Sequence, residues 1–226
     1  MKKGTIFISA GLLLVAAALL LTGYNLWDSR RAGERADAAL EQLTPMIAED
    51  PAPAEGRILS TGAAADENPT EIEYPDYVLN PNMDMPVQNI RGNDYVGVLR
   101  LPTLDKELPI INEWSYPNLK VSPCRFNGTA YLDNMVICAH NFRRHFGEIK
   151  DLAYGDPVTF TDMDGNVFSY EVVEIETLKP TAVEEMTSGD WDLTLFTCTK
   201  GGATRVTVRC VRTDGAKSPD VGEASS

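Results

Sequence analysis

The stretch Leu193-Thr-Leu-Phe-Thr-Cys198 has the alternating pattern of a β-strand and ends on a cysteine. Successive side chains of a strand point to opposite faces, so the two leucines share one face while Phe196 and Cys198 share the other. The turn Thr199-Lys-Gly-Gly202 follows, and a second strand begins at Arg205. We therefore expect Cys198 at an accessible strand end, with Arg205 returning beside it.

This placement bears on the chemistry of Cys198. Most free cysteines are small buried hydrophobes, and Cys198 can be interpreted that way. A strand end that faces an exposed turn also suits a nucleophile, which needs nearby positive charge to form a thiolate. Arg205 supplies such charge and can hydrogen-bond the oxyanion that forms when a thiolate attacks a carbonyl. We expect Arg209 and Arg212 to lie on the solvated face of the same strand.

The chain contains two histidines, His140 and His145. His140 directly follows the apolar stretch Met135–Ala139, a boundary at which a histidine is often a structural residue. His145 lies within Phe142–Leu152, which we predict to be a helix, and is most simply a surface residue. If Cys198 works with an imidazole, His140 is therefore the favoured partner.

Between residues 84 and 214, short apolar stretches are separated by turn residues. The sequence Asp162-Met-Asp-Gly-Asn166 has Asp-Gly at its centre, which is typical of a hairpin turn. Several short strands at this spacing predict a single all-β domain, either a sandwich or a closed barrel. The predicted strands are Tyr95–Leu101, Leu108–Ile111, Met135–Ala139, Pro157–Phe160, Val167–Ile175, Leu193–Thr197 and Arg205–Val211.

The N-terminus has the composition of a membrane-spanning helix. Lys2 and Lys3 precede the uncharged run Thr5–Thr22, which would span roughly 27 Å as a helix. A cleaved secretory signal also begins with basic residues, but no A-x-A-like cleavage site follows this run. Tyr24 and Trp27 lie where interfacial aromatic residues occur. We therefore expect an uncleaved anchor.

The rest of the chain divides by composition. Ala36, Ala39, Leu40 and Leu43 recur with helical spacing and predict a juxtamembrane helix. The segment after it is rich in Ala, Pro and Glu and has too few large apolar residues to form a core. The predicted segments are a cytoplasmic N-terminus (1–4), a transmembrane anchor (5–23), a juxtamembrane helix (24–48), a flexible linker (49–83), a folded domain (84–214) and a disordered tail (215–226).

Charge and cysteine content limit the partners and cofactors. A formal net charge of -13 argues against a nucleic-acid partner, because like charges repel. The four cysteines could form two disulfides in an extracellular domain, but we expect Cys124 and Cys210 to be buried thiols. Metal-ligand spacings such as C-x-x-C are lacking, and Glu184 and Glu185 have no third ligand. We predict neither a metal nor a cofactor.

These residues resemble the signature of sortases, the membrane-anchored cysteine transpeptidases of Gram-positive bacteria. The resemblance rests on Thr194-Leu-x-Thr-Cys198, an arginine seven residues later, and Ala139-His-Asn141. Papain-like enzymes, in contrast, have Cys before His. The resemblance implies a closed eight-stranded β-barrel with short helices. Its implied site residues are Cys198 as nucleophile, His140 as general acid/base, Arg205 as electrostatic stabiliser, and Thr197 and Asn141 next to the substrate.

The same resemblance implies the substrates and the location. The acyl donor would be a secreted protein with a C-terminal LPxTG-type sorting signal, and the acceptor an amine of a peptidoglycan precursor or a pilin. The protein would cross the cell membrane once, with a cytoplasmic N-terminus and an extracellular catalytic domain. The sortase class stays open, since Leu178–Trp191 is too short for the helical insertion of class B. The alternatives are a cell-wall cysteine hydrolase or peptidase and a non-catalytic membrane-anchored binding domain.

Overall fold

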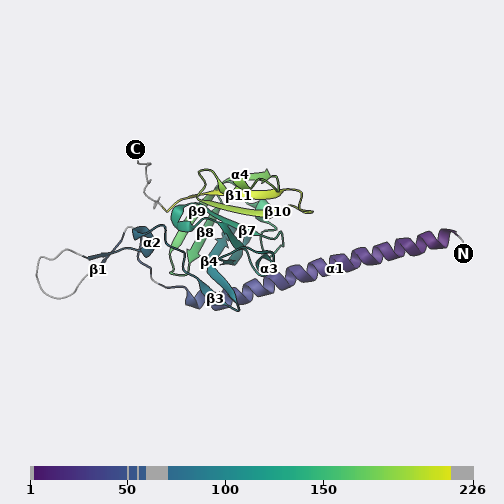
Figure 1. Ribbon diagram of the computed structural model, residues 1–226, viewed down its shortest axis with the longest axis horizontal. Helices are drawn as coiled ribbons and strands as arrows, with labels where there is room; N and C mark the ends of the chain where they lie inside the picture. Colours follow the sequence, from purple (N-terminus) through teal and green to yellow (C-terminus); the bar gives the residue numbers. More distant parts are fainter. Residues whose placement is uncertain (1–2, 50, 55, 60–70, 215–226) are drawn as a thin grey trace, which may run out of the picture.

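The computed structural model describes residues 3–49, 51–54, 56–59 and 71–214. A long helix, α1 (Lys3–Leu43), runs along one side of a β-barrel and extends far beyond it (Figure 1). The predicted tail 215–226 and residues 60–70 of the predicted linker lie outside the described residues.

Eight strands close the barrel in the described part of the chain. The order around the barrel is β4-β5-β6-β7-β10-β11-β9-β8, and β8 pairs with β4 to complete the circle. A ninth strand, β3 (Gln88–Ile90), extends the edge of β4. The predicted closed eight-stranded barrel is therefore confirmed. Its strands are β4 (Asn93–Leu101), β5 (Lys106–Ile111), β6 (Cys124–Asn127), β7 (Met135–Ala139), β8 (Pro157–Asp162), β9 (Val167–Leu178), β10 (Leu193–Cys198) and β11 (Arg205–Arg212).

Short helical elements fill the connections between strands. The predicted hairpin turn joins β8 to β9, where Gly165 has a φ of +82°, a conformation that favours glycine. The α-helices are α2 (Asp76–Leu79), α3 (Tyr116–Leu119) and α4 (Val183–Thr187), and the 3₁₀-helices are η1 (Thr44–Met46), η2 (Pro102–Leu104), η3 (Ala130–Leu132) and η4 (Ile149–Asp151).

Alternation along the strands creates two apolar layers. Leu193 and Leu195 of β10 point into the barrel, where they meet Val208 and other interior residues. Phe196 and Cys138, from the opposite faces of β10 and β7, belong to a second cluster outside the barrel wall. All five residues of β7 are buried because both of its faces are covered.

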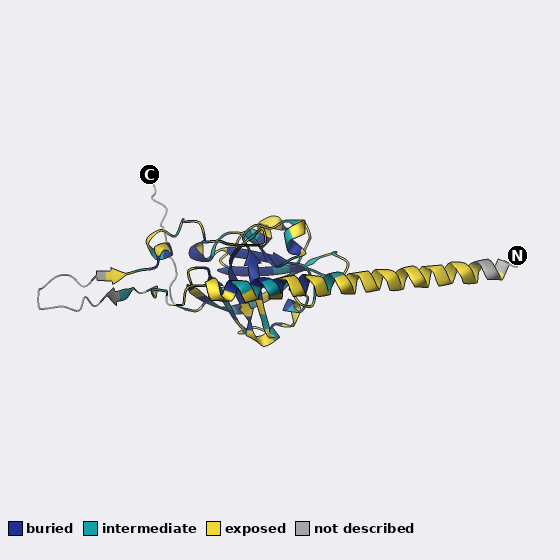
Figure 2. Ribbon diagram, turned by 90° about the horizontal axis from the view of Figure 1, so that it is seen from below, coloured by how far each residue is buried: buried dark blue, intermediate teal, exposed yellow. Residues whose placement is uncertain are grey.

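The outer cluster is completed by the C-terminal half of α1. The helix is exposed from residue 7 to 27, whereas Ala32, Ala36, Ala39 and Leu43 are buried against the barrel (Figure 2). The predicted helical stripe therefore exists, but it packs on the folded domain instead of forming a free stalk. The α-helix ends at Leu43 and gives way to η1, which contains Pro45. This helix is long and apolar enough to cross a membrane.

Part of the predicted linker is also structured. The strands β1 (Arg57–Leu59) and β2 (Glu71–Glu73) form a small antiparallel sheet. Tyr77 of α2 is buried and stacks on Tyr131, with 4.9 Å between the ring centroids. Val78 and Met83 pack against the same core, so packing against the barrel begins before residue 84.

The prediction that Arg209 lies on a solvated face of β11 is wrong. Only 2% of Arg209 is exposed, because α4 covers this part of the strand. Its guanidinium donates hydrogen bonds to the Glu176 carboxylate at 2.8 Å, the Thr194 hydroxyl at 3.0 Å and the Met186 carbonyl at 3.1 Å. The buried charge is therefore paired and hydrogen-bonded, as burial requires.

Arg212 is also buried, so the same prediction is wrong there. Its guanidinium forms ion pairs with Asp133 at 2.9 Å and Asp214 at 2.6 Å. The backbone N–H of Arg212 donates to the Asp192 carboxylate. These bonds tie the end of β11 to two other segments, around Asp133 and Asp192, and to Asp214 just after the strand.

We predict that Arg209→Ala lowers the free energy of unfolding by about 3 kcal/mol, because it leaves Glu176 and buried carbonyl groups without their donor. The matched control is Arg100→Ala, which breaks the exposed Arg100–Glu107 pair and should cost at most about 1 kcal/mol. Urea unfolding in detergent, followed by tryptophan fluorescence, measures both. Equal effects would contradict the structural role of Arg209.

Candidate active site

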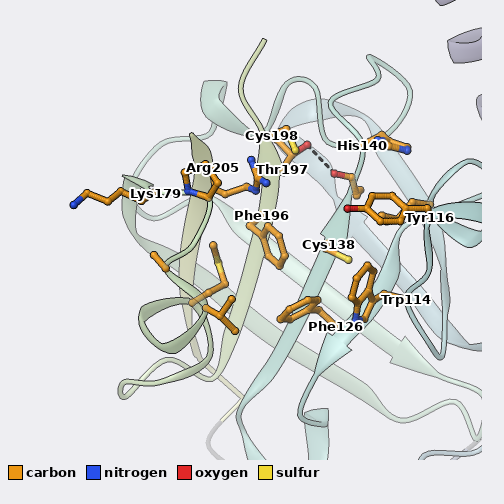
Figure 3. A pocket seen from close by; sticks show the side chains of 16 residues that line it. Trp114, Tyr116, Phe126, Cys138, His140, Lys179, Phe196, Thr197, Cys198 and Arg205 are labelled. Atoms are coloured by element: carbon orange, nitrogen blue, oxygen red, sulfur yellow. Dashed lines mark hydrogen bonds between the residues drawn. The ribbon is translucent and has the colours of Figure 1, made fainter. Parts of the chain in front are cut away.

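A cavity of about 290 Å³ lies where β7 and β10 end and β11 begins. Cys198, His140, Arg205 and Thr197 line it, together with mainly apolar side chains (Figure 3). The cavity therefore combines an apolar surface with a small set of chemically active groups.

Strand register brings three of the predicted residues together. Cys198 pairs with Arg205 in the antiparallel β10–β11 ladder. Thr197 pairs with Ala139 in the parallel β10–β7 ladder, so His140, the next residue, follows β7 at the level of Cys198. Figure 3 shows Cys198 between Arg205 on one side and His140 on the other.

Arg205 is oriented by the turn that precedes it. Its Nη1 donates to the carbonyl oxygens of Gly202 and Thr204, both at 3.2 Å. These bonds leave other guanidinium N–H groups for a ligand, since an arginine has five donors. The turn thus holds a fixed positive charge at the mouth of the cavity.

His140 is half-buried beside the cavity. Burial lowers the pKa of its ring and Lys120 acts in the same direction, while the Asp28 carboxylate of α1 opposes them. The imidazole is therefore neutral at pH 7 and able to accept a proton. Its ring packs on Phe142 with 4.8 Å between centroids, and within the described residues no hydrogen bond joins it to Cys198. Catalytic hydrogen bonds of unliganded sites often form only with substrate present.

The four cysteines differ in accessibility. Cys198 is half-buried, whereas Cys124, Cys138 and Cys210 are buried, and all four are free thiols. Burial raises the pKa of Cys124 and of Cys210 to about 12, and it raises the pKa of Cys138 as well. The thiolate is the reactive form, so these three thiols are poor nucleophiles. The expectation of buried thiols at Cys124 and Cys210 is confirmed.

Of Thr197 and Asn141, the two residues expected next to the substrate, only Thr197 lines the cavity. Thr197 lines the cavity but is only 4% exposed, and its hydroxyl donates to the Ala139 carbonyl at 2.8 Å (Figure 3). This bond joins the ends of β10 and β7. Asn141 is exposed and lies outside the cavity lining.

An aromatic cluster in the cavity was not predicted. Phe126 of β6 packs edge-to-face on Phe196 at 5.3 Å and lies 5.5 Å from the ring of Trp114. The strand β6 itself was missed, because Cys124–Asn127 is short and its pairing with β7 is irregular. The sequence signal was the concentration of aromatic residues between 114 and 126.

The segment after His140 corrects two predictions. Residues 143–148 form turns followed by η4, not a helix, and the Phe142 carbonyl accepts hydrogen bonds from the N–H groups of His145 and Gly147. His145 is fully buried against the backbone of Ala32 in α1 instead of lying on the surface. Burial lowers the pKa of its ring to about 4. Packing of α1, which local periodicity does not reveal, explains the burial of His145.

Residues 99–213, about half of the chain, match the family model of the sortase domain. The chain belongs to the sortase family. Sortases are cysteine transpeptidases, so this chain is an enzyme of that kind. A comparison with curated proteins found no match.

Solved sortase structures are also similar to this sortase. One is sortase C from Clostridium perfringens SM101, which is 28% identical, with 61% of this chain and 81% of that chain covered and a TM-score of 0.48. Another is Clostridium perfringens sortase C with the C-terminal cell wall sorting motif, at 27% identity, 61% and 82% coverage and a TM-score of 0.49. A third is sortase C1 from Streptococcus agalactiae, at 26% identity, 60% and 75% coverage and a TM-score of 0.49.

The described residues contain no group of three or more His, Cys, Asp and Glu side chains that could hold a metal ion. Glu184 and Glu185 lie in the first turn of α4, and both are exposed. Among the groups that line the cavity are a thiol, an imidazole, a guanidinium and a hydroxyl, a set suited to nucleophilic and acid–base chemistry.

We predict that His145 makes this sortase sensitive to acid. Its pKa falls from 6.5 in the unfolded chain to about 4 in the fold, so the unfolded chain binds the proton more readily. The stability is present above pH 6.5 and is lost as the pH falls toward 4, by about 2 kcal/mol at pH 5. Urea unfolding at pH 7 and pH 5 measures this loss.

The control is His145→Phe, which keeps an aromatic ring in the buried site and cannot be protonated. His140 is present in both proteins, so the difference between them isolates His145. We expect the variant to lose about 2 kcal/mol less than the unmodified chain between pH 7 and pH 5. Identical losses would contradict a buried, neutral His145.

Proposed function

We propose that this sortase cleaves an LPxTG-type sorting signal near the C-terminus of a secreted protein and joins the acyl product to an amine. The observation that carries the proposal is the placement of Cys198 between Arg205 and His140 at the cavity. The apolar side chains of the cavity, among them Phe196 and Met186, suit the leucine and proline of such a signal.

The first half of the reaction forms a thioester. The neutral imidazole of His140 takes the proton of the Cys198 thiol, and the thiolate sulfur attacks the carbonyl carbon of the threonine. Arg205 hydrogen-bonds the resulting oxyanion. The carbon–nitrogen bond then breaks, and the imidazolium of His140 donates its proton to the leaving glycine amine.

The second half transfers the acyl group. An incoming amine attacks the thioester carbonyl, His140 accepts a proton from that amine, and the Cys198 thiolate leaves. The acceptor is an amine of a peptidoglycan precursor, which anchors the protein to the cell wall, or a pilin lysine, which extends a pilus. Thr197 acts by holding the ends of β10 and β7 together, because its hydroxyl is already bonded to Ala139.

The anchor supports the location in the cell. Residues 7–27 of α1 are exposed and apolar, and Lys2 and Lys3 precede them. Basic residues before an apolar span favour a cytoplasmic N-terminus, which supports a barrel outside the cell that is attached to the membrane by one helix. Secreted proteins with sorting signals meet the enzyme on that side.

We predict that Cys198→Ala abolishes both cleavage and the acyl adduct, because no other accessible thiol is available among the described residues. The test incubates the full chain in detergent with a panel of LPxTG-type peptides and an amine, and mass spectrometry identifies cleavage, adduct and joined product. Cys138→Ala is the matched control, since it removes a buried cavity thiol and leaves Cys198. Cleavage by Cys198→Ala would disprove the mechanism.

The same assay separates transfer from hydrolysis. Added amine should divert the acyl product away from the free acid. If increasing amine concentration leaves the acid as the sole product, the enzyme is a cysteine hydrolase.

We predict that Arg205→Ala lowers kcat by about 10²- to 10³-fold, which is the usual effect of removing an oxyanion donor. Arg205→Lys keeps the charge but loses the planar donor geometry, so it should restore only part of the rate. Steady-state kinetics with the best peptide of the panel measures kcat and KM for both variants. A KM effect alone, with unchanged kcat, would contradict oxyanion stabilisation by Arg205.

A further inference from the structure

The cavity lies at the end of the barrel that faces the exposed half of α1. Strand β10 runs toward Cys198, and the turn after it reaches in the direction of the N-terminus (Figure 1). Leu119 of α3 belongs to the same buried cluster as Ala39 and Leu43 of α1. The end of β10 that lines the cavity therefore points toward the part of the chain that we expect to enter the membrane.

The barrel is fixed to the anchor helix and does not hang from it by a linker. The stretch between Trp27 and Ala32 contains no glycine or proline, and from Ala32 onward the helix is packed on the barrel. Asp37 of the helix forms an ion pair with Arg144 of the segment after His140. Orientation of the helix in a bilayer thus sets the orientation of the cavity.

The cavity also lies close to the expected membrane surface. Twenty residues, Phe7–Leu26, span about 30 Å as a helix, the thickness of the hydrocarbon layer. Trp27 then lies at the interface, and Asp28 follows it. The Asp28 carboxylate is near enough to His140 to act on its pKa, and so is the side chain of Lys120. His140 is therefore near the part of α1 that follows the expected span.

Exposed aromatic residues occupy this end of the barrel. Tyr116 is 73% exposed and Trp114 is 44% exposed, and their rings meet edge-to-face at 6.0 Å. Lys120, which is also exposed, follows α3 directly. Tryptophan, tyrosine and lysine are the residues that favour the membrane–water interface, where an apolar body and a polar end are both satisfied.

We infer that the cavity-bearing end of the barrel rests on the bilayer surface, with Trp114 and Tyr116 in the headgroup layer and Cys198 facing that layer. This inference rests on the membrane anchoring proposed above. Its occupant is a phospholipid surface, because Trp114 and Tyr116 are exposed aromatic residues of the same kind that Tyr24 and Trp27 supply at the expected interface on α1. A substrate segment then enters the cavity along the membrane and not from bulk solvent.

The three tryptophans of the chain provide the test. Trp27 reports on the anchor, and Trp114 on the proposed contact. Trp191 precedes β10 and lies at the opposite end of that strand from Cys198. The full chain is reconstituted in phosphatidylcholine vesicles that contain a lipid with a nitroxide-labelled headgroup. Three single-tryptophan chains, each with the other two tryptophans changed to phenylalanine, are compared by fluorescence quenching.

We expect Trp27 and Trp114 to be quenched at least twofold more than Trp191. A water-soluble nitroxide, applied to the same chains in detergent, corrects for their different exposure. Equal quenching of Trp114 and Trp191, with Trp27 strongly quenched, would overturn the surface contact while leaving the anchor intact. An unquenched Trp27 would overturn the anchor and the inference with it, and neither result depends on the peptide assay of catalysis.

A second variant tests whether packing of α1 on the barrel holds the cavity at the membrane. A side chain at Gly33 of α1 would collide with the Arg144 side chain, so Gly33→Leu should loosen the barrel from the helix. We expect quenching of Trp114 to fall toward that of Trp191 in this variant, while quenching of Trp27 stays unchanged. If Trp114 is quenched as strongly as before, helix docking is not what holds the cavity at the membrane.

Discussion

The site depends on the hydrogen-bond register of β10 between β7 and β11. Parallel pairing of Thr197 with Ala139 and antiparallel pairing of Cys198 with Arg205 bring together residues that are distant in sequence. The Thr197 hydroxyl adds a bond to the Ala139 carbonyl at the point where both strands end. Because side chains alternate along a strand, a slip of one residue would turn Cys198 to the opposite face. The closed barrel, which has no free edge between these strands, prevents such a slip.

Much of this arrangement was predictable from local patterns. Alternation and short apolar stretches predicted seven of the barrel strands, and the chain order of His140, Cys198 and Arg205 indicated the candidate site. β6 was missed because its irregular pairing hides the alternation. The aromatic cluster of Phe126, Phe196 and Trp114 was missed for a related reason, since it joins segments that no local pattern connects.

The predictions that Arg209 and His145 lie on the surface are wrong for the same physical reason. In each case an element distant in sequence covers the residue. Arg209 lies on the outward face of β11, as alternation predicts, but α4 covers that face. His145 follows two exposed arginines, but α1 covers it. In both cases an unpaired charge would be energetically costly in the buried position. Arg209 satisfies its charge with Glu176 and backbone carbonyls, whereas His145 avoids a charge because its pKa falls.

The distribution of apolar residues along α1 changes where the helix begins to pack on the barrel. Up to Trp27 the helix is apolar on all sides and exposed, which suits lipid. From Ala32 it has a single buried face of small residues, which lets its backbone approach the barrel closely. Between these residues there is little more than one helical turn. With the proposed anchoring, a helix that leaves lipid and meets protein within little more than one turn gives the barrel almost no freedom to move away from the membrane. The distance from Cys198 to the bilayer is then a property of the fold, set by the same packing that buries His145.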